Sequence, residues 1–160
     1  MRPFRMLFIG LLVLAGWRMF AVPGYPQHAN AVQSLSIAEA DAIIGQSGPC
    51  LVVVMAAWCH PCIEELPALG SLARKYQPRG LRVLGLSVDY AGPQAIQPLI
   101  DRSKIDFPVY WVGEAALDAY GITRIPLLIF VRDGQAVKRL EGKRRPADIE
   151  AEMAAFLDTP

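Results

Sequence analysis

The sequence predicts an α/β fold, a three-layer α/β/α sandwich in which helices cover both faces of a central mixed sheet. Three observations support this prediction. The run from Leu51 to Met55 is apolar and rich in valine, which is typical of a strand covered on both faces. A helical pattern follows this run directly, and a second strand candidate lies at 81–88. After a further helical segment come a β-hairpin and a closing helix, and this order of elements favours a mixed sheet between two helical layers.

The boundaries of the individual elements follow from capping, turn and periodicity signals. Ser36 and Glu39 form a capping-box pattern at the start of a helix that ends near Ile44. The helix that starts near His60 contains Pro67, which we expect to kink it. The remaining predicted elements are helices at 93–102, 114–120 and 146–157 and strands at 107–111, 125–131 and 135–140, with Asp133-Gly134 as the hairpin turn.

The beginning of the chain differs in composition from the rest. Arg2 and Arg5 precede an apolar run at 6–22 that a single arginine interrupts. Such a pattern directs the following chain out of the cytoplasm, and the run is close to the minimum length of a membrane-spanning helix. We therefore expect a membrane anchor at 1–22, a linker at 23–34 and an exported domain at 35–158; the alternative for the first segment is a cleaved signal peptide.

The overall composition narrows the possible functions. The 160-residue chain has a net charge of +1, which does not favour a nucleic-acid-binding surface, and 53% hydrophobic residues, which excludes a disordered chain. Three cysteines are too few for a small domain that disulfides hold together. Two of them are spaced C-x-x-C, and such a pair next to a β-α-β pattern indicates redox chemistry. We expect no cofactor, no metal and no nucleic-acid partner.

The redox pair lies in Cys59-His60-Pro61-Cys62, at the predicted junction between a strand and a helix. Free backbone N–H groups and the helix dipole make the first turn of a helix positive, which lowers the pKa of a cysteine placed there. Cys59 has that position, and Cys62 lies on the same helical face and can close a disulfide with it. We expect Cys59 to attack a target disulfide and Cys62 to resolve the mixed disulfide. Pro61 suits the first helical turn, where a missing N–H group costs nothing.

Two features near this pair leave alternatives open. A protonated His60 would favour the Cys59 thiolate and make the couple more oxidising, whereas an exposed loop histidine would have no effect. The pair would also serve as half of a zinc site, but the other candidate ligands, His28, His60 and Cys50, lack the spacing of such sites. Cys50 is expected to be a small buried side chain at the start of the central strand.

These motifs resemble those of a known family. Trp58-Cys59-His60-Pro61-Cys62 with Glu64-Glu65-Leu66-Pro67 after it, and the later segment Tyr120-Gly121-Ile122-Thr123-Arg124-Ile125-Pro126, are similar to the motifs of the TlpA/ResA/DsbE group of thioredoxin-like oxidoreductases. The resemblance covers roughly residues 35–158 and implies a thioredoxin-like fold on the periplasmic side of the inner membrane, anchored there or free in the periplasm. One departure is Val53, which stands where thioredoxin itself carries a buried acid.

The resemblance also implies roles for individual residues. Pro126 would follow a cis peptide bond beside the disulfide, and Ile125 would offer its backbone to an extended substrate. Trp58 would shield the sulfurs beside this substrate site. Glu65 would have a raised pKa and carry the proton of Cys62.

Three functions follow as hypotheses. The one that the resemblance favours is the reduction of disulfides in exported proteins with electrons from a membrane donor of thiols; some members of the group serve the haem-binding cysteines of apocytochrome c. The second is net oxidation or isomerisation of the same class of proteins, to which His60 is the only pointer. The third is a non-enzymatic copper metallochaperone that uses Cys59 and Cys62 as soft ligands.

Overall fold

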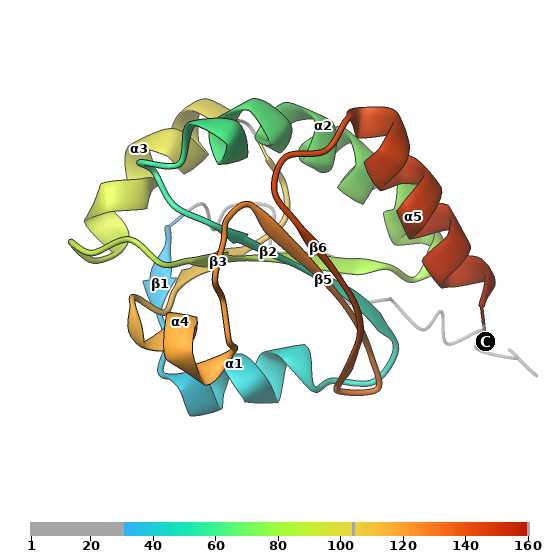
Figure 1. The fold of residues 1–160 in the computed structure, drawn as a ribbon, viewed down its shortest axis with the longest axis horizontal. Coiled ribbons are helices and arrows are strands. Elements are labelled where there is room, and N and C mark those ends of the chain that lie inside the picture. The colour runs from blue at the N-terminus through green and yellow to red at the C-terminus, as the bar shows by residue number, and fades with distance from the viewer. Residues whose placement is uncertain (1–30, 104, 160) are drawn as a thin grey trace, which may run out of the picture.

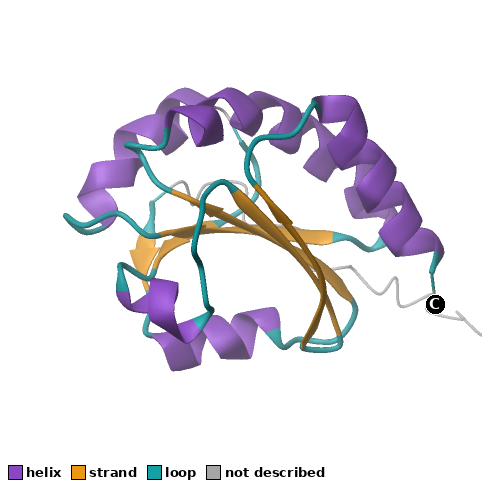
Figure 2. Cartoon of the chain, viewed as in Figure 1, coloured by secondary structure: helices purple, strands orange, loops and turns teal. Residues whose placement is uncertain are grey.

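The computed structural model describes residues 31–103 and 105–159. In this part of the chain six strands form one sheet between two layers of helices (Figures 1 and 2), which confirms the predicted three-layer sandwich. The strands are β1 (Gln33–Ser34), β2 (Pro49–Met55), β3 (Arg82–Ser87), β4 (Val109–Trp111), β5 (Leu127–Arg132) and β6 (Gln135–Glu141). The helices are α1 (Ile37–Ile44), α2 (His60–Tyr76), α3 (Pro93–Ser103), α4 (Ala115–Ala119) and α5 (Pro146–Asp158), and a short 3₁₀ helix, η1 (Gln77–Arg79), follows α2.

The sheet is mixed, with the strand order β1-β4-β3-β2-β5-β6. β1, β4, β3 and β2 run parallel, whereas β5 is antiparallel to β2 and β6 to β5. β2 lies in the interior of the sheet, where every residue from Cys50 to Met55 is buried. The valine-rich run therefore forms the covered strand that the sequence predicts. Because Met55 pairs with Ser87, the carboxyl ends of β2 and β3 lie next to each other, and α2 begins at this edge.

Helices cover the two faces of the sheet unequally. α2, α3 and α5 lie over one face, and α1 and α4 over the other (Figure 2). On the first face Phe130 of β5 packs edge to face against Phe156 of α5, with the ring centroids 5.2 Å apart. Ile149 and Met153 of α5 are fully buried in the same core. This packing holds α5 beside α2 and so fixes the helix that carries the cysteine pair.

Some element boundaries differ from the prediction. Residues 33–34, expected to end the linker, form β1 and pair with residues 110–111 of β4. A strand of two exposed residues leaves no periodic signal in the sequence. β5 begins at Leu127 rather than at residue 125, because Pro126 has no N–H group to donate to a neighbouring strand. α2 continues past Pro67 as one helix.

The predicted membrane segment, residues 1–22, and the linker up to residue 30 lie outside the described residues. The part of the chain that the structure does describe, from residue 31 on and without residues 104 and 160, contains no helix that is long and apolar enough to cross a membrane. This part starts just before β1, at one edge of the sheet.

Candidate active site

The first turn of α2 is built around Cys59. Cys59 is the N-cap of the helix, with extended backbone angles, and its sulfur accepts a hydrogen bond from the N–H group of Cys62 at 3.3 Å. The N–H group of Cys59 donates to the carbonyl oxygen of Ala56 at 3.1 Å, which closes the turn between β2 and α2. The sulfur of Cys59 therefore lies where the free N–H groups and the dipole of α2 favour a negative charge.

Cys59 and Cys62 form a disulfide, with their Cα atoms 5.3 Å apart. Both side chains are nearly buried, with 4% and 2% of their surface exposed. Pro61 lies in the first turn of α2, where its missing N–H group has no helical partner to lose. A buried disulfide in one helical turn can open to a dithiol and close again with little movement of the backbone.

A groove with a volume of about 290 Å³ is lined by Trp58, the residue before Cys59. Its lining comes from the residue before Cys59, the end of β3, α4 and the segment that leads into β5: Trp58, Val88, Leu117, Ile122, Thr123, Arg124 and Ile125. The peptide bond between Ile125 and Pro126 is cis, and Pro126 is buried. The fold thus brings Trp58 and Ile125, which are far apart in the sequence, to one concave surface.

Trp58 is an exposed aromatic residue at the edge of the groove. About half of its surface, 53%, is accessible to solvent. Its ring stacks on that of Tyr90, with centroids 5.5 Å apart and the planes within 2° of parallel. Tyr90 is exposed as well and belongs to the loop between β3 and α3. Together with Tyr90, Trp58 presents a flat aromatic surface to solvent.

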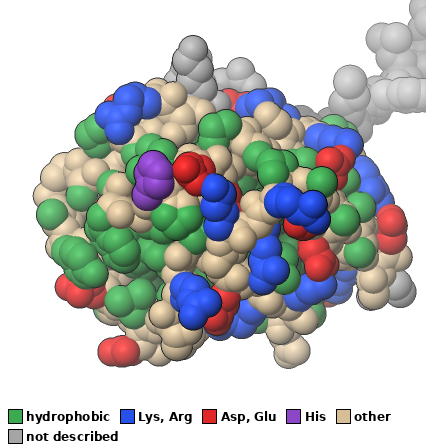
Figure 3. All heavy atoms as spheres, turned by 45° about the horizontal axis from the view of Figure 1, so that its top comes forward, with side chains coloured by type: hydrophobic (Ala, Val, Ile, Leu, Met, Phe, Trp, Pro, Cys, Tyr) green, Lys and Arg blue, Asp and Glu red, His purple; other side chains and the backbone are tan. Residues whose placement is uncertain are grey.

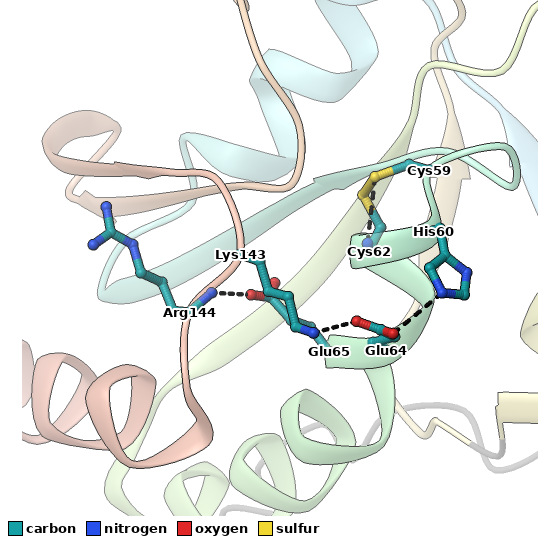
Figure 4. A network of polar contacts seen from close by, with 7 residues as sticks. All are labelled: Cys59, His60, Cys62, Glu64, Glu65, Lys143 and Arg144. Carbon is teal, nitrogen blue, oxygen red and sulfur yellow. Dashed lines mark hydrogen bonds and ion pairs between the residues drawn. A yellow bond between two sulfur atoms is a disulfide. The ribbon is translucent and has the colours of Figure 1, made fainter.

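A chain of charged side chains runs from His60 to the loop between β6 and α5 (Figure 4). The Nε2 atom of His60 lies 3.1 Å from the Oε1 atom of Glu64. The other carboxylate oxygen of Glu64 pairs with the ammonium group of Lys143, and this hydrogen bond is the main reason that the pKa of Glu64 is lowered. Lys143 opens the basic run Lys143-Arg144-Arg145 that precedes α5. Here it is tied to the helix that carries the cysteines.

Glu65 is the buried acid of α2, with 4% of its surface exposed. Its Oε1 atom accepts a hydrogen bond from the backbone N–H group of Arg144 (Figure 4). Its Oε2 atom is buried and has no hydrogen-bond partner among the described residues. Burial raises the pKa of Glu65, and the hydrogen bond from Arg144 only partly opposes this. A carboxyl group in these surroundings can hold a proton at a higher pH than an exposed one.

The raised pKa of Glu65 predicts a specific dependence of stability on pH. The folded state binds the proton of Glu65 more tightly than the unfolded state, so this contribution to stability is complete below the unfolded pKa, about 4.3. It is lost as the pH rises through the folded pKa. Glu65→Gln lacks this proton. We therefore expect the unfolding free energy of the variant to increase relative to that of the wild type as the pH rises from 4 to 8. Chemical denaturation at each pH measures both free energies.

Glu64→Gln is the matched control for this experiment. The pKa of Glu64 is lowered, so its contribution to stability is present above the unfolded pKa and is lost as the pH falls. We expect the control to lose stability relative to the wild type as the pH rises, a change of opposite sign and smaller size, because this pair is exposed and screened by solvent. Parallel curves for the two variants would contradict the burial effect assigned to Glu65.

Cys50 is the third thiol of the chain and takes no part in the pair. It is buried in β2, free of any disulfide, and burial raises its pKa to about 11. At neutral pH it is therefore a protonated and unreactive thiol. This agrees with the expectation of a small buried side chain.

Asp89 is a residue of the site that the sequence analysis missed. It lies two residues after the end of β3 and is buried, with 2% of its surface exposed. Both of its carboxylate oxygens accept a hydrogen bond from the N–H group of Ala57, at 3.0 and 3.1 Å, and Oδ2 also accepts one from the hydroxyl group of Ser87 at 2.7 Å. The available signal was its position, because the carboxyl ends of neighbouring parallel strands meet at one edge of a sheet.

Comparison with known proteins places this geometry among redox proteins. The model of the AhpC/TSA family matches residues 27–139. Thiol-disulfide oxidoreductase ResA of Bacillus anthracis is 26% identical over 95 residues, 58% of this chain and 54% of ResA, so the chain spans about half the length of this relative. Thioredoxin of Pseudomonas aeruginosa is 30% identical over 116 residues, 72% of this chain and 82% of that protein. A secreted Mycobacterium tuberculosis disulfide oxidoreductase homologous to E. coli DsbE has a similar fold, with a TM-score of 0.60, 19% identity and coverage of 69% of this chain and 83% of that one. The expected thioredoxin-like fold is confirmed.

Proposed function

Because the chain belongs to the AhpC/TSA family, we propose that it is a thiol–disulfide oxidoreductase that reduces disulfides of exported proteins. The observation that carries this proposal is the Cys59–Cys62 disulfide in the first turn of α2, next to an open groove. A disulfide that closes so short a loop adds little to stability in the loop-entropy account. Exchange with a second disulfide is the chemistry that this position favours.

The reaction starts from the reduced protein. The Cys59 thiolate attacks one sulfur of the target disulfide, so that a bond forms between Cys59 and the target while the second target sulfur leaves and takes up a proton. Cys62 then attacks the sulfur of Cys59, the Cys59–Cys62 bond closes, and the target leaves with both sulfurs reduced. Two electrons pass from the protein to the target. A donor of thiols must return them, because this chain ends the cycle oxidised.

Glu65 is the proposed acceptor of the proton that Cys62 loses. It lies three residues after Cys62, on the same side of α2. Its burial and its raised pKa suit a group that takes up a proton, as does its Oε2 atom, which has no hydrogen-bond partner among the described residues. The hydrogen bond from Arg144 holds the other oxygen in place.

The groove is the proposed site for the target chain. Trp58, the residue before Cys59, lines it, and so does Ile125 from the segment before β5. An extended target segment beside Ile125 and Pro126 would pair with the backbone of Ile125 in the manner of an added strand. The aromatic faces of Trp58 and Tyr90 would contact apolar side chains of the target next to its disulfide.

The surroundings of His60 favour the reductive direction. A protonated His60 would stabilise the Cys59 thiolate and make the couple more oxidising. The side chain of His60 is 82% exposed, however, and Glu64 lies 3.1 Å from it with the opposite charge. Solvent and Glu64 both weaken the field of His60 at the sulfur of Cys59.

An exported location and a membrane donor of electrons complete the proposal. The basic residues ahead of the apolar run at 6–22 support export and an anchor on the periplasmic side of the inner membrane. The similar Mycobacterium tuberculosis oxidoreductase is a secreted protein. An enzyme held at the membrane by its N-terminus would meet both exported targets and a membrane donor of thiols.

The reduction potential of the Cys59–Cys62 couple tests the direction of electron flow. We expect a value of about −250 mV or lower, near that of thioredoxin, when the full chain is equilibrated with glutathione or dithiothreitol buffers. The oxidised and reduced fractions are measured by trapping free thiols with a maleimide and separating the labelled and unlabelled protein by mass spectrometry. A value near −120 mV, as in strong periplasmic oxidants, would instead make the protein a net oxidant.

A further inference from the structure

Asp89 carries a buried carboxylate that none of the steps above uses. An ionised carboxylate only accepts hydrogen bonds. Both partners of the Asp89 carboxylate, the backbone N–H group of Ala57 and the hydroxyl group of Ser87, donate to it. The hydroxyl oxygen of Ser87 in turn accepts from the N–H group of Asp89 at 3.3 Å. The partners of the carboxylate thus suit its charged form.

The loop that holds Asp89 is itself fixed from the side of β4. The indole N–H group of Trp111 donates to the carbonyl oxygen of Asp89 at 2.7 Å. The N–H groups of Val112 and Gly113 donate to the carbonyl oxygen of Ser87 at 3.0 and 3.2 Å. The carboxylate therefore stands on a rigid support, at the edge of the sheet where β2 leads into α2.

Asp89 holds the turn that presents the nucleophilic sulfur. Ala57 lies two residues before Cys59, a separation that the chain spans in at most about 7 Å between Cα atoms. The same turn is closed by the hydrogen bond from the N–H group of Cys59 to Ala56. One residue after Asp89, the ring of Tyr90 stacks on that of Trp58. The loop after β3 thus holds the turn at two consecutive residues.

We propose that Asp89 is a positioning residue that holds the Ala56–Trp58 turn and supplies a fixed negative charge near Cys59. Thioredoxin itself carries a buried acid in the strand before its motif, where this chain has Val53. Val53 pairs with Gly85 of β3, and Asp89 follows the end of that same strand. In this chain the charge would come from Asp89, in the loop after the neighbouring strand β3. A fixed negative charge near Cys59 opposes its thiolate and makes the dithiol a better reductant.

This inference rests on the proposed function and makes it more specific, because it names the group that sets the acidity of the nucleophile. The test is the pH dependence of alkylation of reduced Cys59 by iodoacetamide in the full chain. Asp89→Asn keeps the shape of the side chain and removes the charge. We expect the midpoint of the pH–rate profile to fall, with about five- to tenfold more thiolate at a pH below both midpoints, and the reduction potential to rise.

Asp158→Asn is the matched control, since it removes one negative charge at the far end of α5 from the site. We expect its alkylation profile to coincide with that of the wild type. If Asp89→Asn lowered the melting temperature but left the profile and the potential unchanged, Asp89 would be a structural residue only and the inference would be wrong.

Other ionisable groups surround the cysteine pair on every element of the site and must be separated from Asp89. They are His60, Glu64 and Glu65 on α2, Tyr90 after β3, Arg124 before β5, and Lys143 and Arg144 before α5. His60 is the one whose ordinary pKa lies near neutrality. We expect Asp89→Asn to cause the same shift in a His60→Gln background. Loss of the shift in that background would assign it to His60 and overturn the inference.

A measurement on the wild type covers the case in which Asp89→Asn does not fold. Coupling between two charges is reciprocal, so the carboxyl carbon of Asp89 should change its NMR shift as Cys59 titrates in the reduced protein, and should not do so in the oxidised protein. If the NMR shift of the Asp89 carboxyl carbon did not change as Cys59 titrates, the inference would be overturned. If the protein reduced protein disulfides at normal rates but Asp89 and Cys59 showed no coupling, only the role of Asp89 would be refuted. If the two groups were coupled but the protein reduced no protein disulfide, the proposed function would be refuted.

Discussion

Cys59→Ser is expected to abolish disulfide exchange, with a loss of at least about a thousandfold in the rate of target reduction. A serine hydroxyl group at the N-cap of α2 can accept the same hydrogen bond but does not form the sulfur nucleophile that exchange requires. The measurement is the rate at which the reduced protein opens the disulfide of a model protein substrate. Cys62→Ser should retain the first attack and accumulate a mixed disulfide between Cys59 and the target, visible by mass spectrometry.

Cys50→Ala is the control for these variants. Cys50 is fully buried and its pKa is raised to about 11, so its removal should leave the exchange rate unchanged and affect stability only. A mixed disulfide on Cys62 in the Cys59→Ser variant, at a rate near that of the wild type, would reverse the two roles. Equal loss of the first attack in both variants would contradict the order of the steps.

Trp58→Ala is expected to lower kcat/KM for a protein target by about tenfold, mainly through a higher KM, because it removes a large aromatic surface from the groove. Reduction of a small disulfide such as glutathione disulfide should change little, since such a substrate does not fill the groove. Tyr90→Ala should have a smaller effect of the same kind, because Tyr90 supports Trp58 by stacking. Steady-state kinetics with both substrates separates these contributions.

Val137→Ala is the matched control for the aromatic pair. Val137 on β6 has 56% of its surface exposed, as Trp58 has 53%, but it lies outside the groove. Figure 3 shows one face of the molecule. Hydrophobic side chains gather on its left, and most of the charged side chains lie toward its centre and right. We expect the control to match the wild type with both substrates. A loss in Trp58→Ala that is equal for small and protein disulfides would mean that Trp58 acts on the sulfurs themselves.

Several parts of this protein could be predicted from local signals in the sequence. Hydrophobic periodicity and capping patterns predicted the central strand at 51–55, the helix that follows it and the hairpin at Asp133-Gly134, and all three are present. The spacing of Cys59 and Cys62 at the junction of that strand and helix predicted the redox pair. Each of these signals lies within about one turn or strand of chain, so it can be read without knowing what packs against it.

The groups that surround the sulfurs could not be predicted in this way, because tertiary packing brings them together. The hydrogen bond from Ala57 to Asp89 joins residues 32 apart in the chain, and that from Arg144 to Glu65 joins residues 79 apart. The burial of Glu65, which raises its pKa, depends on tertiary packing around α2. Likewise β1 exists only because residues 33–34 find β4 beside them. Such contacts depend on how whole layers pack, and no local pattern in the sequence encodes them.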